Sequence, residues 1–354
     1  MKHRYVMALL IAAHNEEIVL ANTLNLAIKA GMKPEHIYVV DDCSDDSTGR
    51  VARSILGKEN VCRVRRSGKG LALSKGAKKF ALSEGYRWIH VADADGGFSK
   101  DYFRILRRDL RVKYAAGTGY VRSFPGHTVG QYRVFEYTIG MEIHRRFQAL
   151  TNTIAIIPGP TSCFRHDIFN RINFANNSLT EDFDVTLQIH RNKLGKIQFI
   201  PEAVAYTQDP GTFTDFVRQI IRWNRGIMQG IVRHKVGRRF KMLDSYLTYQ
   251  LLENFMFFVS YFIFIPYLSL SQHDTNIPAL AFLIDVAIIF ILTVLVAMKS
   301  RRMDILSAFP HIYLFRWISL MVFIKTFTEV VILRKFRDTE GIWDSSGRYR
   351  LQAN

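Results

Sequence analysis

The N-terminal third of the chain alternates short apolar runs with amphipathic stretches, and this alternation limits the possible folds more than any other feature. Apolar runs at 6–13, 37–40, 61–64 and 88–92 have the length of buried strands. Strands that alternate with helices are typical of a mainly parallel sheet with helices on both faces. We therefore predict an α/β fold, whose first strand is the apolar stretch 5–13 rather than a signal peptide.

The amphipathic stretches predict where the helices lie. Helices are expected at 16–30, 47–56, 70–83, 129–150, 181–191 and 212–234, with an interrupted strand at 154–164. Gly31 and Gly85 would end the first and third helices. Ser44 or Asp45 would cap the second helix at its N-terminus.

Three polar clusters follow three of the expected strands directly. They are His14–Glu17, Asp41–Asp46 and Asp93–Asp95. Ligands on open parallel sheets bind beyond the carboxyl ends of the strands. The clusters are thus expected to outline one binding site at one rim of the sheet.

Asp93 and Asp95 are candidate metal ligands. Alternate residues of an extended segment point the same way, so both carboxylates can face one ion. Hard oxygen ligands of this kind suit Mg²⁺ or Mn²⁺. A solvated turn is the competing interpretation, because Gly96 and Gly97 follow.

Three further motifs carry chemically useful side chains. Ser67-Gly68-Lys69-Gly70 opens a helix, where close backbone approach and a lysine favour an anion, although the spacing is not that of a P-loop. Thr180-Glu181-Asp182 lies at a helix start and offers a carboxylate as general base or, alternatively, a helix cap. Gln219, Arg222 and Trp223 stand at i, i+3 and i+4, so they share one helix face.

Composition points to a membrane rather than to nucleic acid. The chain has a net charge of +17, yet 48% of its residues are hydrophobic and 13% aromatic. No nucleic-acid-binding motif accompanies the charge, whereas an anionic membrane surface attracts Lys and Arg next to apolar segments. Cys43, Cys62 and Cys163 are too few and too scattered for a disulfide framework or a zinc site.

Two apolar runs, at 246–270 and 278–298, are each long enough to cross a membrane. Cations at 235–241 and 299–302 flank the pair, so both outer ends are expected in the cytoplasm. The next apolar segment, 305–333, is interrupted by charges and favours interfacial or re-entrant helices over a third crossing.

The order Asp93-Ala94-Asp95, Thr180-Glu181-Asp182 and Gln219-Ile220-Ile221-Arg222-Trp223 resembles the signature of membrane-bound processive family-2 glycosyltransferases. Cellulose, chitin and hyaluronan synthases belong to that group. Gly159-Pro160 with Phe164-Arg165, and the C-terminal segment 343–348, are similar to segments of the hyaluronan synthases. The resemblance implies a GT-A-type (Rossmann-like) α/β catalytic domain followed by a helical membrane region.

The resemblance also implies roles for individual residues. Asp182, with Glu181, is implied as the catalytic base, and Asp93 and Asp95 as the ligands of Mg²⁺ or Mn²⁺. The residues implied to bind the UDP-sugar donor are Ala13, Glu16, Asp41, Asp42, Lys69, Asp93, Asp95, Gln219, Arg222, Trp343, Arg348 and Arg350. Those implied to bind the glycan acceptor are Trp223, Gly159 and Cys163.

We thus expect an integral membrane enzyme whose catalytic domain, 1–240, lies in the cytoplasm at the plasma or inner membrane. A membrane region at 241–335 and a tail at 336–354, similar to a gating loop, would follow. The expected reaction is an inverting transfer from a UDP-sugar to a hydroxyl of a growing glycan, with a homo-oligomer left open. A non-processive transferase acting on a polyprenyl phosphate, or an inactive accessory protein that binds a nucleotide-sugar, are the alternatives.

Overall fold

The computed structural model describes residues 4–124, 126, 128–174, 178–239 and 241–335. Their contacts group them into two compact units. The first unit contains residues 4–124 and 144–208, and the second contains 126–143 and 209–335.

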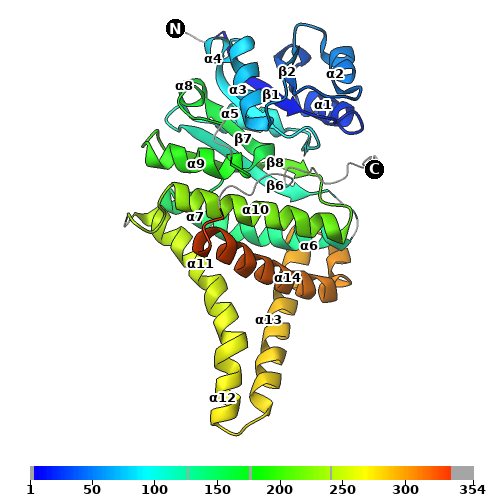
Figure 1. Cartoon of the computed structure of the whole chain (residues 1–354). Coiled ribbons are helices and arrows are strands. Elements are labelled where there is room, and N and C mark those ends of the chain that lie inside the picture. Colours follow the sequence, from blue (N-terminus) through cyan, green and yellow to red (C-terminus); the bar gives the residue numbers. More distant parts are fainter. Residues whose placement is uncertain (1–3, 125, 127, 175–177, 240, 336–354) are drawn as a thin grey trace. The chain divides into compact units, whose positions relative to one another are not determined.

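The first unit is built on a sheet of eight strands (Figure 1). These are β1 (Tyr5–Ala13), β2 (Ile37–Asp41), β3 (Val61–Arg63), β4 (Tyr86–Ala92), β5 (Gly97–Phe98), β6 (Ala116–Ser123), β7 (Ser162–Arg165) and β8 (Ile197–Thr207). Its helices are α1 (Leu20–Lys29), α2 (Thr48–Leu56), α3 (Lys69–Lys79), α4 (Leu82–Gly85), α5 (Tyr102–Asp109), α7 (Arg146–Thr151), α8 (His166–Phe169) and α9 (Glu181–Arg191).

The strand order is β3-β2-β1-β4-β7-β6-β8-β5. The first four strands in this order are parallel, as the alternation of strands and helices predicts. β7 is antiparallel to both β4 and β6, whereas β6 and β8 are parallel to each other. The predicted mostly parallel α/β fold is therefore confirmed.

Side chains from alternate positions of β1 build two separate cores. Leu9 and Ile11 pack in the core that contains α1 and α5 residues, and Leu10 packs in the core that contains α3 and α9 residues. All three are fully buried. Because a strand directs successive side chains to opposite faces, a continuous apolar run is what two covered faces require.

The three polar clusters lie at neighbouring strand ends, as predicted. Ala13 at the end of β1 pairs with Asp41 at the end of β2, and Ile11 pairs with Ala92 at the end of β4. The loop after β1 and the loop after β2 are joined by several hydrogen bonds. Asn15 N donates to Ser44 Oγ at 3.1 Å, and Asp45 N donates to Asn15 Oδ1 at 2.9 Å.

Some expected boundaries and caps are wrong. The first helix begins at Leu20 rather than at residue 16, because Asn15 has a positive φ of 55° and the chain first turns toward the loop after β2. Neither Ser44 nor Asp45 caps α2; instead Asp46 Oδ1 accepts the bond from Thr48 N at 2.9 Å. Of the strand expected at 154–164, only Ser162–Arg165 forms, since Pro158 and Pro160 interrupt the preceding segment.

The second unit is helical. It comprises α6 (Thr128–Ile139), α10 (Phe213–Arg233), α11 (Met242–Val259), the π-helical turn Ser260–Phe264, α12 (Ile265–Ser271), α13 (Asn276–Ser300), the 3₁₀ turn Met303–Leu306, α14 (Phe309–Phe327) and the π-helical turn Thr328–Ile332. Its main core joins side chains of α6, α10, α13 and α14, among them Tyr132, Phe216, Val296 and Phe315.

Within the second unit, α11–α12 and α13 form a helical hairpin (Figure 1), and its exposed side chains are largely apolar. Among the described residues, two helical segments are long and apolar enough to cross a membrane by length and composition, Met242–Ser271 and Asn276–Ser300. Tyr267, Leu270 and Leu283 are each more than 60% exposed. Such a continuous apolar surface is unusual for a helix that faces water.

Candidate active site

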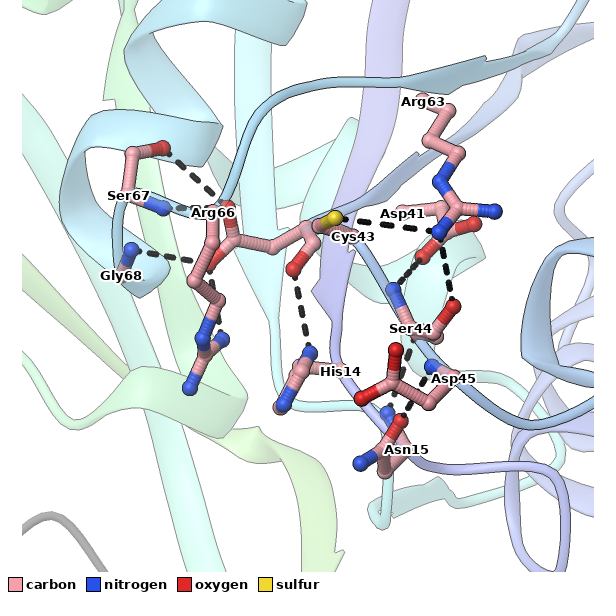
Figure 2. Close-up of polar contacts among 11 residues, drawn as sticks. His14, Asn15, Asp41, Cys43, Ser44, Asp45, Arg63, Arg66, Ser67 and Gly68 are labelled. Atoms are coloured by element: carbon pink, nitrogen blue, oxygen red, sulfur yellow. Dashed lines mark hydrogen bonds and ion pairs between the residues drawn. The ribbon is translucent and has the colours of Figure 1, made fainter.

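The loop after β2 is fixed to the loop after β1 and to the segment after β3, within the first unit. Figure 2 shows His14 Nδ1 hydrogen-bonded to the carbonyl of Asp42 (3.0 Å) and Arg63 Nη2 donating to the carbonyl of Ser44 (2.9 Å). Asp41 Oδ1 accepts a bond from Ser44 N at 2.8 Å, which closes the turn at the strand end. Three strand ends thus share one bonded framework.

Asp42 is buried, and its carboxylate binds the segment that precedes α3 (Figure 2). Oδ1 accepts bonds from Ser67 N (2.8 Å) and Ser67 Oγ (3.1 Å). Oδ2 accepts bonds from Gly68 N (2.8 Å) and Arg66 Nη1 (2.9 Å). Because a carboxylate offers about four acceptor positions, these four donors occupy the whole group. Asp42 therefore fixes the turn from which Lys69 extends.

Lys69 is the first residue of α3, and its ammonium group joins two carboxylates. Nζ lies 2.6 Å from Asp93 Oδ1 and 2.5 Å from Glu181 Oε1. Burial alone would lower the pKa of Lys69, but Asp93 and Glu181 outweigh burial and hold the pKa above its ordinary value. Since an ammonium group has three N–H donors, one remains for a further anion.

Asp93 lies directly after β4, and its carboxylate approaches Gly159 closely. A Cβ atom added to Gly159 would lie 2.8 Å from Asp93 Oδ2 and 2.9 Å from Oδ1, so a larger residue here would force the Asp93 carboxylate to move. Gly159 begins the 3₁₀ turn Gly159–Thr161. Asp95 lies two residues after Asp93 and is partly exposed. Both predicted metal ligands are thus accessible side chains at the rim.

The donor set fits a divalent cation that is bound together with a ligand. Among the described residues, no cluster of three or more His, Cys, Asp or Glu side chains is placed to hold a metal alone. Mg²⁺ commonly uses one or two carboxylates together with substrate phosphates, and Mn²⁺ also accepts such oxygen ligands. Asp93 and Asp95 provide two such carboxylates on a short segment.

Glu181 and Asp182 begin α9, as predicted. Glu181 contacts Lys69, whereas Asp182 Oδ1 accepts a bond from Phe183 N at 2.8 Å. Burial first, and then the negative charge of Glu181, raise the pKa of Asp182 to about 6, although Lys69 acts in the opposite direction. A base with this pKa is largely deprotonated at neutral pH and still accepts a proton readily.

Neighbours of Asp182 have structural roles. Asp184 is buried, and its Oδ2 accepts a bond from Gln188 Nε2 at 2.8 Å, so it belongs to the interior of α9. Thr180 precedes α9 but makes no side-chain cap, and its buried Oγ1 has no partner among the described residues. The contacts therefore support neither Asp184, the other carboxylate close to Asp182 in the sequence, as the base nor Thr180 as a helix cap.

Other predicted residues of the first unit lie below the surface. Ala13 is buried, and its carbonyl accepts a bond from Asp42 N at 2.9 Å. Glu16 is also buried, with its backbone N bonded to Thr48 Oγ1 at 2.7 Å. Cys163 is fully buried on β7 within the sheet core, a placement that does not suit contact with a sugar acceptor.

The second unit presents Gln219, Arg222 and Trp223 on α10. Arg133 on α6 contacts two of them, since its Nη2 donates to Gln219 Oε1 at 2.5 Å and its guanidinium lies 4.6 Å from the Trp223 ring centre. Arg222 is partly exposed and makes no hydrogen bond or ion pair with any described residue.

Sequence reasoning missed Arg133. One signal for it was present, because Val129, Arg133 and Tyr137 stand at i, i+4 and i+8 and place a cation on an apolar helix face. The predicted donor residues Trp343, Arg348 and Arg350 lie outside the described residues.

The sheet order and the strand-end carboxylates define a GT-A-like α/β protein. Residues 3–226 match the family model described as "Glycosyltransferase like family 2". The chain therefore belongs to glycosyltransferase family 2, as its motifs predict.

Two curated proteins with transferase or synthase names are similar to the chain in sequence. The chain is 29% identical to "Probable glycosyltransferase YdaM" of Bacillus subtilis (strain 168) over 75% of its own length and 64% of that protein. It is 24% identical to "Poly-beta-1,6-N-acetyl-D-glucosamine synthase" of Staphylococcus aureus (strain COL) over 63% of its length and 55% of that protein. The chain thus spans less than two thirds of both relatives.

The fold is also similar to a solved structure, the mannosyltransferase PcManGT from Pyrobaculum calidifontis in complex with GDP-Man and Mn²⁺. The TM-score is 0.57 at 15% identity, with 87% of each chain covered. This similarity supports the GT-A-like fold.

Proposed function

We propose that this protein is an inverting glycosyltransferase that moves a sugar from a UDP-sugar to a hydroxyl of a growing glycan at the cytoplasmic face of a membrane. Asp182 acts as the general base. Asp93 and Asp95 bind the donor and its cation, and Trp223 positions the acceptor sugar. Arg222 and Gln219 meet the diphosphate.

The contact that carries this proposal is the bridge made by Lys69. Its ammonium links Asp93, at the end of β4, with Glu181, the neighbour of Asp182. A carboxylate motif for a metal-bound diphosphate and a carboxylate motif for a base are therefore neighbours within one unit. Transfer with inversion needs both, since the base must activate a hydroxyl while the diphosphate leaves.

Proton transfer and stabilisation of the leaving group are assigned to different side chains. Asp182 takes the proton of the acceptor hydroxyl as the oxygen attacks the anomeric carbon. Lys69 offers its third N–H to the departing diphosphate, and Arg222, which has no hydrogen bond or ion pair with the described residues, offers its guanidinium. A bound Mg²⁺ or Mn²⁺ would neutralise charge on the same phosphate oxygens.

The relatives narrow the choice of donor. A family member named as a poly-β-1,6-N-acetyl-D-glucosamine synthase supports UDP-N-acetylglucosamine as the first donor to test. An inverting polymerase acting on a glycan suits the aromatic Trp223, because an indole face matches the C–H face of a pyranose. The hyaluronan-synthase-like features of 343–348 remain part of this proposal.

The second unit supports attachment to a membrane. The exposed apolar segments Met242–Ser271 and Asn276–Ser300 are each long enough to span a bilayer. We place the catalytic domain at 1–240, the membrane region at 241–335 and a cytoplasmic tail at 336–354, with 305–333 as interfacial or re-entrant helices. Cations at 235–241 and 299–302 support a topology in which both hairpin ends lie in the cytoplasm.

A donor screen tests the proposal. Purified protein in detergent is mixed with UDP-N-acetylglucosamine, UDP-glucose, UDP-glucuronate or UDP-galactose, with Mg²⁺ or Mn²⁺ and oligosaccharide acceptors, and UDP release is measured. We expect release with one donor, loss of release in EDTA, and a strong decrease in Lys69→Met. Lys78→Met is the matched control, because Lys78 is exposed on the same helix. Absence of UDP release from every donor would contradict the proposal.

A further inference from the structure

Arg133 is a fully buried arginine in the middle of α6. Its guanidinium forms an ion pair with Glu136 and donates a hydrogen bond to Gln219 Oε1. It also lies 4.8 Å from the ring centre of Phe216 and 4.6 Å from that of Trp223. All of these residues belong to the second unit, so the cluster is a feature of that unit alone.

The contact with Gln219 determines which end of the amide is available. A guanidinium group has only donors, so the atom of Gln219 that faces Arg133 is the carbonyl oxygen. The amide nitrogen, with its two N–H donors, is left for another partner. An anion needs donors, and a glutamine without this constraint could present either end.

The contact with Trp223 determines which ring face is available. The guanidinium lies over one face of the indole, as in a cation–π pair. Among the described residues, the structure records no other ring contact for Trp223. Since one face is covered, a stacked sugar would use the other face, and the plane of the ring is set by Arg133.

Stability alone is a weak reason for this arrangement. Buried ion pairs often contribute little net stability, because removing charges from water offsets their attraction. Arg133 also leaves its Nε without an acceptor among the described residues, which adds a cost. A methionine of similar length would fill the same space without burying a charge, so the observed cluster suits a role in orientation.

We propose that Arg133 is a positioning residue that orients Gln219 and Trp223 for the transfer reaction. This inference rests on the proposed function, in which the amide of Gln219 meets the diphosphate and Trp223 holds the acceptor sugar. Arg133 itself touches neither substrate. Its fork of parallel N–H groups matters as much as its charge, so lysine should not replace it.

The first test measures position without relying on activity. Trp223 is one of four tryptophans, so its share of the emission is obtained by subtracting the spectrum of Trp223→Phe. In Arg133→Met we expect the emission maximum of Trp223 to shift and acrylamide to quench this emission more strongly. An unchanged emission and quenching of Trp223 in Arg133→Met would overturn the proposal.

The second test measures turnover. Arg133→Met and Arg133→Lys should each lower kcat by about 10- to 100-fold, the size of one hydrogen bond to a charged group. The matched control is Arg225→Met, which removes a partly buried arginine of α10 that is paired with Glu329 at 2.5 Å. It should lower the melting temperature by a similar amount and change kcat little. Full activity in Arg133→Lys would overturn the proposal.

A double-mutant cycle shows whether Arg133 acts through Gln219. If it does, Arg133→Met should lower kcat less in a Gln219→Leu background than in the wild type, with the remaining effect acting through Trp223. If Arg133→Met lowers kcat by the same factor in the wild type, in Gln219→Leu and in Trp223→Phe, the proposal is overturned. If the wild-type protein releases no UDP from any donor, the proposed function fails, whereas the emission of Trp223 still decides the positioning role.

Discussion

In the first unit, the ammonium group of Lys69 lies between two carboxylates of the candidate site. Asp93 and Glu181 both contact its Nζ, and Asp182 follows Glu181 directly. The two carboxylates hold the pKa of Lys69 above its ordinary value, so Lys69 remains a cation. Asp182 has no such contact, and its burial beside Glu181 raises its pKa to about 6.

A pH profile of activity should reveal the titration of Asp182. A general base works only when deprotonated, so we expect kcat/KM to rise with pH through about 6 and then to level off, as Asp182 loses its proton. Glu181, Lys69 and Asp93 are the charged groups that influence this titration. Initial rates across a pH series, at saturating metal and acceptor, measure the midpoint.

Glu181→Gln provides the control for that profile. Removal of its negative charge should lower the pKa of Asp182, so the rise should move to lower pH. A profile that is flat between pH 5 and 8 in the wild-type protein would exclude Asp182 as the titrating base.

A substitution at Gly159 tests whether the position of the Asp93 carboxylate matters for donor binding. In Gly159→Ala the new methyl group would lie within 3 Å of both carboxylate oxygens, so the Asp93 side chain must move. We expect weaker metal-dependent UDP binding by calorimetry, with a melting temperature close to that of the wild type because only a side-chain end shifts. Unchanged UDP affinity would show that the position of Asp93 does not matter for the donor.

At the scale of elements, α3 lies unusually close to the segment that precedes α9. A Cβ atom on Gly70 would lie 2.1 Å from the backbone oxygen of Phe174, so the second residue of α3 must be glycine. Asp42 fixes the preceding turn through Ser67 and Gly68. These contacts hold the helix start from which Lys69 reaches the two carboxylates.

Gly70→Ala should therefore destabilise the fold. The clash involves backbone atoms that cannot rotate away, so we expect a loss of about 1–3 kcal/mol, as for other overpacked sites. Gly85→Ala is the matched control, because nothing lies within 4 Å of its added methyl group. Thermal unfolding of both variants checks this. Equal melting temperatures for the two variants would contradict the close approach.

The sequence was sufficient to predict most helices and strands, and to predict which polar clusters lie at the carboxyl edge of the sheet. Apolar runs flanked by polar ends indicate buried parallel strands, and the carboxyl ends of such strands must lie at one edge. The contacts of Lys69, Asp42 and Arg133 were not predictable, because they join residues far apart in the chain. Cys163 shows the same limit, since its place in the core depends on how β7 pairs with β4 and β6.

At the scale of the whole molecule, the proposed residues are divided between two compact units. Asp93, Glu181 and Asp182 belong to the first, and Gln219, Arg222 and Trp223 belong to the second. The second unit also contains the exposed apolar hairpin. A chain that combines a transferase fold with such a hairpin is suited to work at a bilayer.

Membrane insertion can be tested directly. If the hairpin crosses the bilayer as proposed, we expect the protein to remain in the membrane fraction after high-salt and carbonate washes. Leu283→Lys combined with Ile291→Lys should release it, since each lysine near the centre of a spanning helix costs about 3 kcal/mol. Leu150→Lys, at an exposed leucine of the first unit, is the control and should change nothing. Release of the wild-type protein by carbonate would contradict a crossing.

The most direct measurement compares UDP release and UDP binding in the wild-type protein and in Asp182→Asn. With the preferred donor and an acceptor, we predict that the variant loses roughly 10²- to 10⁴-fold in rate, the contribution of a general base, while its affinity for UDP is unchanged. Transfer at the wild-type rate by Asp182→Asn would contradict the account.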